Sequence, residues 1–186
     1  MTAALIVIDM QQGSFTAASP KHDAAGLVRR LNVLAETVRG AGGMVIFVQH
    51  DGPPDDAHHP GRPGWHLLPE LIVRDGDLIV HKRSCDAFLH TGLDAVLRDR
   101  GVGWLIITGS ATDYCVDSTI RSALARGIPT IVPTDGHTTS DRPHLSAVQI
   151  MAHHNAIWSD FIAPNGPATL CRCADVPRML AEASAA

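Results

Sequence analysis

Short, wholly apolar segments alternate along this chain with segments of helical periodicity, and this alternation constrains the fold more than any other feature. The apolar runs predict strands at 5–8, 44–48, 78–80, 104–107, 129–133 and 169–173. The periodic segments predict helices at 27–38, 93–99, 116–125, 145–158 and 176–183. Strands that are apolar throughout and separated by helices are typical of a parallel sheet covered on both faces. The sequence therefore predicts an α/β fold.

The size and charge of the chain narrow the class of protein. A length of 186 residues suits one domain, so we expect residues 1–186 to form a single unit. The net charge of -4 comes without a basic block, which argues against nucleic acid or anionic lipid as a partner. The sequence shows no signal peptide and no apolar run of membrane-spanning length, so we expect no membrane partner.

The four cysteines are too sparse for a disulfide scaffold, and together with the missing signal peptide they indicate a reducing, cytoplasmic protein. Cys171 and Cys173 form a Cys-x-Cys pair, for which a metal site is an alternative. No matching pair stands at a zinc-site spacing, so we interpret them as ordinary thiols.

Polar residues follow several of the predicted strands, at the edge where parallel sheets form their sites. Asp9, His50, Lys82 and Asp135 occupy such positions, and the segment 109–115 leads from a strand to a cysteine at a helix start. A helix N-terminus favours a thiolate and offers N–H groups to an oxyanion. These positions predict a cluster of reactive groups at one edge of the sheet.

Each of these residues has a plainer interpretation when it is taken alone. Asp9 can be a turn or cap aspartate, Lys82 a solvent-exposed lysine, and Cys115 a buried structural cysteine. Together, an acid, a cation and a helix-start cysteine supply what nucleophilic cysteine catalysis needs. We therefore predict Cys115 as nucleophile, with Asp9 and Lys82 beside it.

The segment 51–69 is rich in Pro, Gly, His and Asp and predicts a long, functional loop. The histidines in or beside it, His50, His58, His59 and His66, allow a Cys-His pair or a metal site as alternatives, and surface hydrogen bonding as a third. Dinucleotide, phosphate-loop, serine-elbow and zinc-protease motifs are missing from the sequence. We expect no cofactor and no metal.

At these residues the chain resembles the isochorismatase-like cysteine hydrolase superfamily. The resemblance rests on Leu5-Ile6-Val7-Ile8-Asp9-Met10-Gln11, Val80-His81-Lys82 with Asp86-Ala87-Phe88, Pro63-Gly64-Trp65, and Gly109-Ser110-Ala111-Thr112-Asp113-Tyr114-Cys115-Val116. It runs from Ala4 to about Trp158. His137-Thr138-Thr139, with His153-His154-Asn155, looks most like the group that includes streptothricin hydrolase-like members.

The resemblance implies a three-layer α/β/α sandwich with a six-stranded, mainly parallel sheet. It also implies that Asp9 takes the thiol proton of Cys115 and that Lys82 stabilises both charges. The Ser110–Ala111 peptide would be cis, and the N–H groups of Ala111 and Cys115 would form an oxyanion hole. Nicotinamidases of this superfamily hold a metal where this chain has Gln49-His50-Asp51-Gly52, so the metal triad is not matched.

The resemblance implies hydrolysis of a C–N bond in a small amide, carbamoyl or cyclic amide compound, through a thioester. Vinyl-ether hydrolysis and a non-catalytic scaffold are the alternatives. We expect the substrate pocket to include Gln11, Phe15, His50, Trp65, Phe88 and Tyr114, although the aromatic residues can equally be core. Relatives are commonly homo-oligomers, so we expect at least a dimer.

Overall fold

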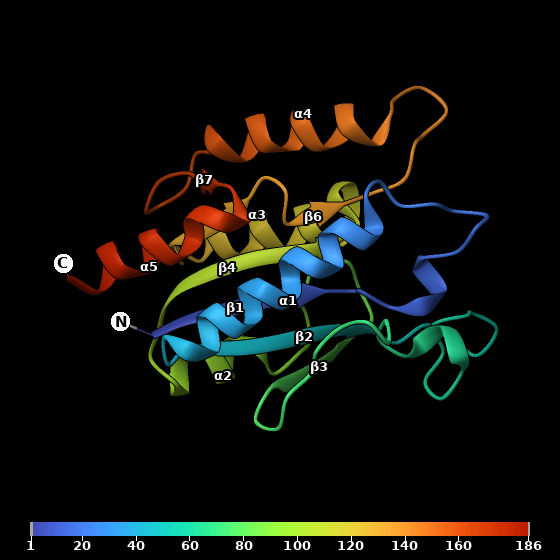
Figure 1. Ribbon diagram of the computed structural model, residues 1–186, viewed down its shortest axis with the longest axis horizontal. Coiled ribbons are helices and arrows are strands. Elements are labelled where there is room, and N and C mark those ends of the chain that lie inside the picture. The colour runs from blue at the N-terminus through green and yellow to red at the C-terminus, as the bar shows by residue number, and fades with distance from the viewer. Residues whose placement is uncertain (1, 186) are drawn as a thin grey trace.

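The computed structural model describes residues 2–185 and has a central sheet with helices on both sides (Figure 1). Met1 and Ala186, which end the predicted domain, lie outside the described residues. The strands are β1 (Thr2–Ile8), β2 (Met44–His50), β3 (Leu78–Lys82), β4 (Val102–Ser110), β5 (Thr130–Pro133), β6 (His137–Thr138) and β7 (Thr169–Cys171). The helices are α1 (Ala24–Gly40), α2 (Leu93–Asp99), α3 (Asp117–Ala125), α4 (Ala147–Ser159) and α5 (Val176–Ala185).

The strands run in the order β3-β2-β1-β4-β5-β7, and each neighbouring pair is parallel. These six strands are those expected from the sequence, so the predicted fold class is confirmed. The short β6 also pairs with the end of β4, through Gly109 and Ser110. Two residues are too few to show strand periodicity, and for this reason the sequence did not reveal β6.

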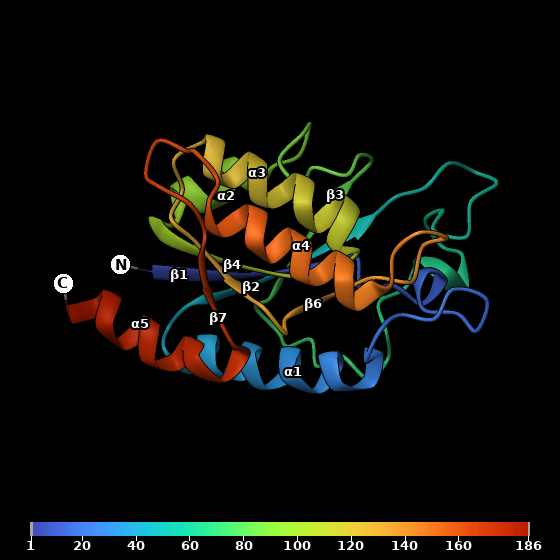
Figure 2. The same ribbon diagram turned by 90° about the horizontal axis from the view of Figure 1, so that it is seen from above.

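The helices divide between the two faces of the sheet (Figure 2). Helices α1 and α5 cover one face, and α2, α3 and α4 cover the other. The alternation of side chains along β1 explains both layers, because successive residues of a strand point to opposite faces. Ala4, Ile6 and Ile8 pack under α2 and α3, whereas Leu5 and Val7 pack against α1.

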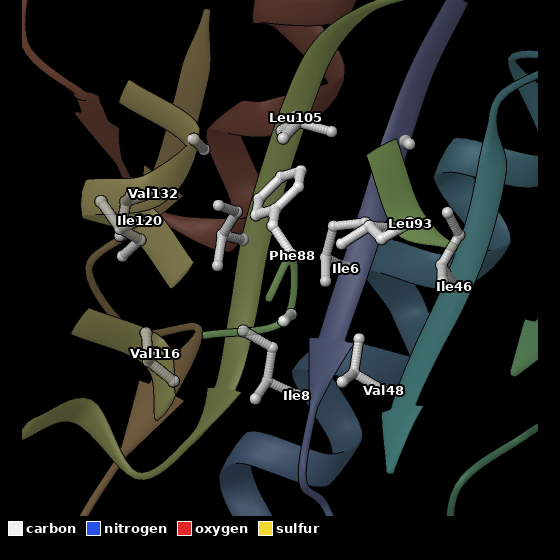
Figure 3. Packing of buried hydrophobic residues seen from close by; sticks show 14 of the residues in the cluster. Ile6, Ile8, Ile46, Val48, Phe88, Leu93, Leu105, Val116, Ile120 and Val132 are labelled. Atoms are coloured by element: carbon white, nitrogen blue, oxygen red, sulfur yellow. The ribbon is translucent and has the colours of Figure 1, made fainter. Parts of the chain in front are cut away.

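Buried aliphatic side chains hold each layer in place. Figure 3 shows Ile6, Ile46 and Val48 beneath Phe88 and Leu93 on the face of α2 and α3. Full burial of one such side chain contributes roughly 1.5–3 kcal/mol to folding. The central strands are therefore buried on both faces, and the residues at their ends extend from a well-packed backbone.

The segment 51–69 is a loop, as predicted, with one 3-10 turn at Pro63–Trp65. The side chain of Gln11 ties it to the sheet. Its Nε2 donates to the carbonyl oxygens of His50 and Trp65 at 3.0 and 2.8 Å, and its Oε1 accepts from the N–H of His50 at 2.8 Å. No helix within residues 2–185 has both the length and the hydropathy to span a membrane.

Candidate active site

The carboxyl ends of three strands bring Asp9, Lys82 and Cys115 together. Asp9 follows β1 directly, Lys82 ends β3, and Cys115 lies in the turn that follows β4. These strands and the intervening β2 are parallel neighbours, so their ends open on one edge of the sheet. The strand-end pattern in the sequence therefore led to three side chains that meet in space.

Asp9 leaves its strand through an unusual backbone conformation. Its φ is 47°, in the left-handed region, which aspartate adopts more readily than most residues. Its N–H still donates to the carbonyl oxygen of Val48 at 2.9 Å, so the backbone remains tied to β2. The carboxyl group is thereby held at the sheet edge and is 6% exposed as a residue.

Lys82 is the link between the other two residues. Its Nζ donates to Asp9 Oδ2 at 2.7 Å, to Cys115 Sγ at 3.2 Å and to the carbonyl oxygen of Ser84 at 2.9 Å. The residue is 2% exposed, and all three donors of its ammonium group are used. A buried ammonium with this set of partners holds the thiol and the carboxylate in fixed positions.

The protonation states follow from burial and from the charges in contact. Burial lowers the pKa of the Lys82 ammonium, but the Asp9 carboxylate and Cys115 offset this effect, so its pKa is raised overall. Burial and then the Asp9 charge raise the pKa of the Cys115 thiol well above its usual range, against the attraction of Lys82. The Lys82 ammonium already balances the Asp9 carboxylate, so a second negative charge on the Cys115 sulfur is disfavoured.

This result corrects one expectation from the sequence, namely that the helix start would favour a thiolate at Cys115. The resting cysteine is a thiol, because it shares a buried space with a carboxylate. The other carboxylate oxygen, Asp9 Oδ1, is buried and accepts no hydrogen bond from the described residues. That oxygen is available to receive a proton.

The turn that carries Cys115 is tightly built. Gly109 has a φ of 117°, and a Cβ there would lie 2.2 Å from the carbonyl oxygen of Ile8, so only glycine fits. The Ser110–Ala111 peptide bond is cis. One turn of π-helix, Thr112–Val116, then leads into α3, with the N–H of Val116 donating to the carbonyl oxygen of Ala111 at 3.2 Å. Such turns are frequent at functional sites.

A buried histidine supports this turn from behind. His137 Nδ1 lies 2.9 Å from Thr112 Oγ1, and its Nε2 lies 3.1 Å from Asn155 Oδ1 of α4. A neutral ring with its proton on Nε2 satisfies both partners. Burial lowers the pKa of His137 to about 4, so the ring is neutral at physiological pH. The ring also contacts Trp158 edge to face, with centroids 5.2 Å apart.

A cavity of about 440 Å³ opens beside the three residues, within the size range of small-molecule sites. Of the residues predicted from the sequence, its lining includes Asp9, His50, Ser110, Ala111, Tyr114 and Cys115. Lys82 does not line it, because this side chain is buried behind Asp9 and Cys115.

Four residues expected in the pocket lie elsewhere. Phe88 is buried in the core under α3, and half-buried Phe15 packs on the α1 side of the sheet. Trp65 stacks on His81 and donates to Asp51 Oδ1 at 2.7 Å, which turns it into an anchor of the loop. Gln11 is fully buried in the loop-tying bonds described above. Packing in the apolar layers holds Phe88 and Phe15, and hydrogen bonds of the loop hold Trp65 and Gln11, which explains why these side chains do not line the cavity.

Asp135 also stands apart from the site, although it follows a strand. Its carboxylate accepts from the backbone N–H of Cys173 at 2.7 Å and faces Arg30, on the α1 side. Strand β5 lies beyond β4 in the sheet, so its end does not reach the cluster. Cys171 and Cys173 are free cysteines, and no group of three or more metal-ligating side chains is present among the described residues.

Sequence reasoning missed several residues of the cavity. They come from the loops that surround the strand ends: Ser14, Lys21, His58, Arg83, Ser84, Cys85 and Arg142. His58, one of the histidines of the loop 51–69, is among them. It lies 2.8 Å through Nε2 from Ser14 Oγ, and 2.8 Å through Nδ1 from Asp56 Oδ1. No periodic pattern in the sequence marks these positions.

His50 is the other histidine of the cavity. Burial and the charge of Lys82 lower its pKa, so the ring is neutral near pH 7. Its Nδ1 is buried and has no hydrogen-bond partner among the described residues. The rings of His50 and His58 lie edge to face with centroids 6.2 Å apart. Neither histidine hydrogen-bonds to Cys115 in the described structure, so the Cys-His alternative finds no support in the geometry.

Comparison with known proteins places the chain in a family. The Isochorismatase domain model matches residues 3–161. Streptothricin hydrolase of Streptomyces noursei is 37% identical over 142 residues, which are 75% of this chain and 51% of that protein. Ureidoacrylate amidohydrolase of Methylorubrum extorquens is 29% identical over 181 residues, covering 77% of this chain and 73% of that protein.

Solved structures agree with the fold. A cysteine hydrolase from Pseudomonas syringae pv. phaseolicola superposes with a TM-score of 0.86 at 25% identity, covering 97% of this chain and 93% of that one. The chain spans about half the length of the streptothricin hydrolases that it matches.

Proposed function

The chain belongs to the isochorismatase family, and we propose that it is a cysteine-dependent amidohydrolase that cleaves a C–N bond of a small amide, carbamoyl or cyclic amide compound. The observation that carries the proposal is the buried contact of Lys82 with both Asp9 and Cys115, two residues that line the cavity. The names of two relatives, an amidohydrolase and a cysteine hydrolase, support this reaction class.

In the first step, Cys115 attacks the amide carbonyl. The thiol proton passes to Asp9 as the S–C bond forms, and the raised thiol pKa means that this transfer accompanies attack. The tetrahedral intermediate then collapses with cleavage of the C–N bond. Asp9 returns the proton to the leaving nitrogen, and a thioester remains on Cys115.

In the second step, water attacks the thioester carbonyl. Asp9 takes a proton from this water, the C–S bond breaks, and the thiolate of Cys115 recovers its proton. This step releases a carboxylic acid from an amide, or a carbamic acid from a carbamoyl compound, and restores the free thiol. Lys82 keeps its proton throughout and compensates whichever neighbour carries the negative charge, which is consistent with its raised pKa.

The oxyanion of both tetrahedral intermediates needs hydrogen-bond donors. We assign this role to the backbone N–H groups of Ala111 and Cys115, because both residues line the cavity within the tightly built turn. Removal of one such donor typically costs about 10²–10³ in kcat in other hydrolases.

Ammonia release from a panel of small primary amides and ureido compounds tests the proposal. Cys115→Ala, Asp9→Asn and Lys82→Met should each lose activity by at least about 10³-fold. Cys85→Ala, which alters another thiol of the same cavity, should retain it. A thioester adduct on the Cys115 peptide, trapped by acid quench, would be direct support. Activity that survives Cys115→Ala would refute the mechanism and favour vinyl-ether hydrolysis.

That the substrate is a small amide is part of this proposal. A single domain over residues 1–186, a homo-oligomeric assembly and a cytoplasmic location also stay predictions. Sedimentation of the full chain would test the assembly.

A further inference from the structure

The cavity beside Cys115 holds more cationic than anionic side chains. Lys21, Arg83 and Arg142 line it, whereas Asp9 is the one carboxylate among its lining residues. Asp9 is already bound to Lys82. The sign of the remaining charge therefore depends on whether the three cations of the lining have partners.

Arg142 has a partner. Its Nε donates to Asp113 Oδ2 at 2.8 Å, and one terminal nitrogen donates to Asp113 Oδ1 at 3.0 Å, which is a two-point ion pair. Its guanidinium also lies over the ring of Tyr114, 5.1 Å from the centroid. Arg142 and Asp113 neutralise each other, so this pair adds no net charge to the cavity.

Lys21 has no carboxylate partner among the described residues. Its Nζ donates to the neutral hydroxyls of Ser19 at 3.2 Å and Ser140 at 2.9 Å, which leaves a third donor without an acceptor among the described residues. Burial and the charge of Arg142 lower its pKa, and the opposing effect of Asp113 is smaller. The ammonium is therefore half-buried against neutral hydroxyls, without a carboxylate in hydrogen-bond contact among the described residues.

Arg83 is the second unmatched cation. It follows Lys82 at the end of β3, is exposed, and makes no hydrogen bond or ion pair with any described residue. Two carboxylates of the loop 51–69 have other partners: Asp56 is bound to the ring of His58, and Asp51, which borders a neighbouring hollow with Arg83, is bound to Trp65 and His81. Lys21 and Arg83, neither of which pairs with a carboxylate among the described residues, thus line the same cavity as Cys115.

Building on the proposed function, we propose that the substrate is an amide or ureido compound that carries a carboxylate, and that Lys21 and Arg83 bind this carboxylate while Cys115 attacks the amide carbonyl. A neutral substrate would leave the Lys21 ammonium without a counterion, and a cationic one would meet repulsion from both side chains. Lys21 supplies a positioned point charge, and Arg83 a planar fork that suits a carboxylate.

Matched pairs of compounds test this inference. N-carbamoylglycine and succinamate each carry one carboxylate, and N-carbamoylglycinamide and succinamide replace it with a neutral amide of similar shape. The acids should have kcat/KM values at least about tenfold above those of the neutral partners, since a charge-assisted hydrogen bond is worth about one to two powers of ten. Lys21→Met and Arg83→Met should each reduce this preference by about tenfold, mainly through KM, and leave the neutral substrates nearly unchanged.

Arg100→Met is the control variant, because Arg100 is exposed at the end of α2, away from the cavity, and removes the same charge. It should keep the preference of the wild type. Equal cleavage of acids and neutral amides, or the same preference in Lys21→Met and Arg83→Met as in the wild type, would overturn the inference and leave the proposed hydrolase function intact.

Binding without turnover separates the two proposals. In a Cys115→Ala background, calorimetry should show that succinamate binds at least about tenfold more tightly than succinamide, and that adding Lys21→Met removes the difference. If the acid binds selectively but neither compound yields ammonia or a thioester in the wild type, the anion site stands and the hydrolase proposal fails. If the two bind equally, the anion site is refuted whatever the activity.

Discussion

Mild acid should destabilise this protein through the single buried ring of His137. The ordinary histidine pKa of 6.5 falls to about 4 in the folded chain, chiefly because burial disfavours the charged ring. The unfolded chain therefore binds a proton at a pH where the folded chain does not. Stability is complete above the unfolded pKa of 6.5 and is lost as the pH falls toward the folded pKa of about 4.

The size of the effect follows from the two pKa values. One pKa unit corresponds to about 1.4 kcal/mol, so His137 removes about 3 kcal/mol from the free energy of unfolding once the pH is below its folded pKa. Most of this loss, about 2 kcal/mol, falls between about pH 7 and about pH 5. Urea unfolding followed by tryptophan fluorescence at these two pH values measures it.

The matched variant is His137→Gln, whose amide can donate to Asn155 and accept from Thr112 without titrating. Its loss of stability between the two pH values should be smaller than that of the wild type by about 2 kcal/mol. His50 and the carboxylates are present in both proteins, so their contributions cancel. If the wild type and the variant lose the same stability between the two pH values, the reasoning is refuted, because the His137 ring would then not be held neutral.

Three further predictions concern the site and the loop beside it. Lys82→Met should cost about 3–5 kcal/mol of stability in urea unfolding, because it leaves a buried carboxylate unpaired. Adding Asp9→Asn should recover much of this loss, and additive losses would contradict the coupling between Lys82 and Asp9. Asp9→Asn should lower the pKa of the Cys115 thiol and so increase its alkylation by iodoacetamide at neutral pH while abolishing hydrolysis. An unchanged alkylation rate would show that the charge of Asp9 does not raise the pKa of this thiol. Gln11→Ala should cost about 1–3 kcal/mol by leaving buried backbone groups unpaired, whereas Gln12→Ala, on an exposed neighbour, should cost little; equal urea midpoints would remove Gln11 as the anchor.

The sequence predicted the sheet and its helices because their burial pattern is periodic. Residues 5–8 are apolar on both faces, and the observed β1 extends this run only to Thr2. Strand β4, in contrast, continues to Ser110, beyond the predicted end at Ile107. Thr108, Gly109 and Ser110 are small or polar and do not look like strand, but pairing with β1 and β6 holds them in the sheet. Tertiary pairing overrode local preference at this edge.

The residues of the candidate site likewise differ in how well the sequence predicts them. Asp9, Lys82 and Cys115 could be predicted because each is placed by the end of a strand. The aromatic residues of the expected pocket could not be placed from the sequence, because residues such as Phe88 and Trp65 occur both in cavity linings and in packed cores. Lys21 gave no signal, since its position depends on the fold of the segment between β1 and α1.

The groups proposed for catalysis and those proposed to bind the substrate differ in how firmly the fold positions them. The groups proposed for chemistry are attached to buried parallel strands and to a glycine-dependent turn, and few substitutions there would preserve the contact of Lys82 with Asp9 and Cys115. The groups that meet the rest of a substrate, Lys21 and Arg83 among them, lie on loops or exposed strand ends that tolerate replacement. A change at the rim can therefore alter the charge of the preferred substrate without disturbing the cysteine. Relatives that share the three central residues need not share a substrate, and the pairing of each rim cation is the feature to compare among them.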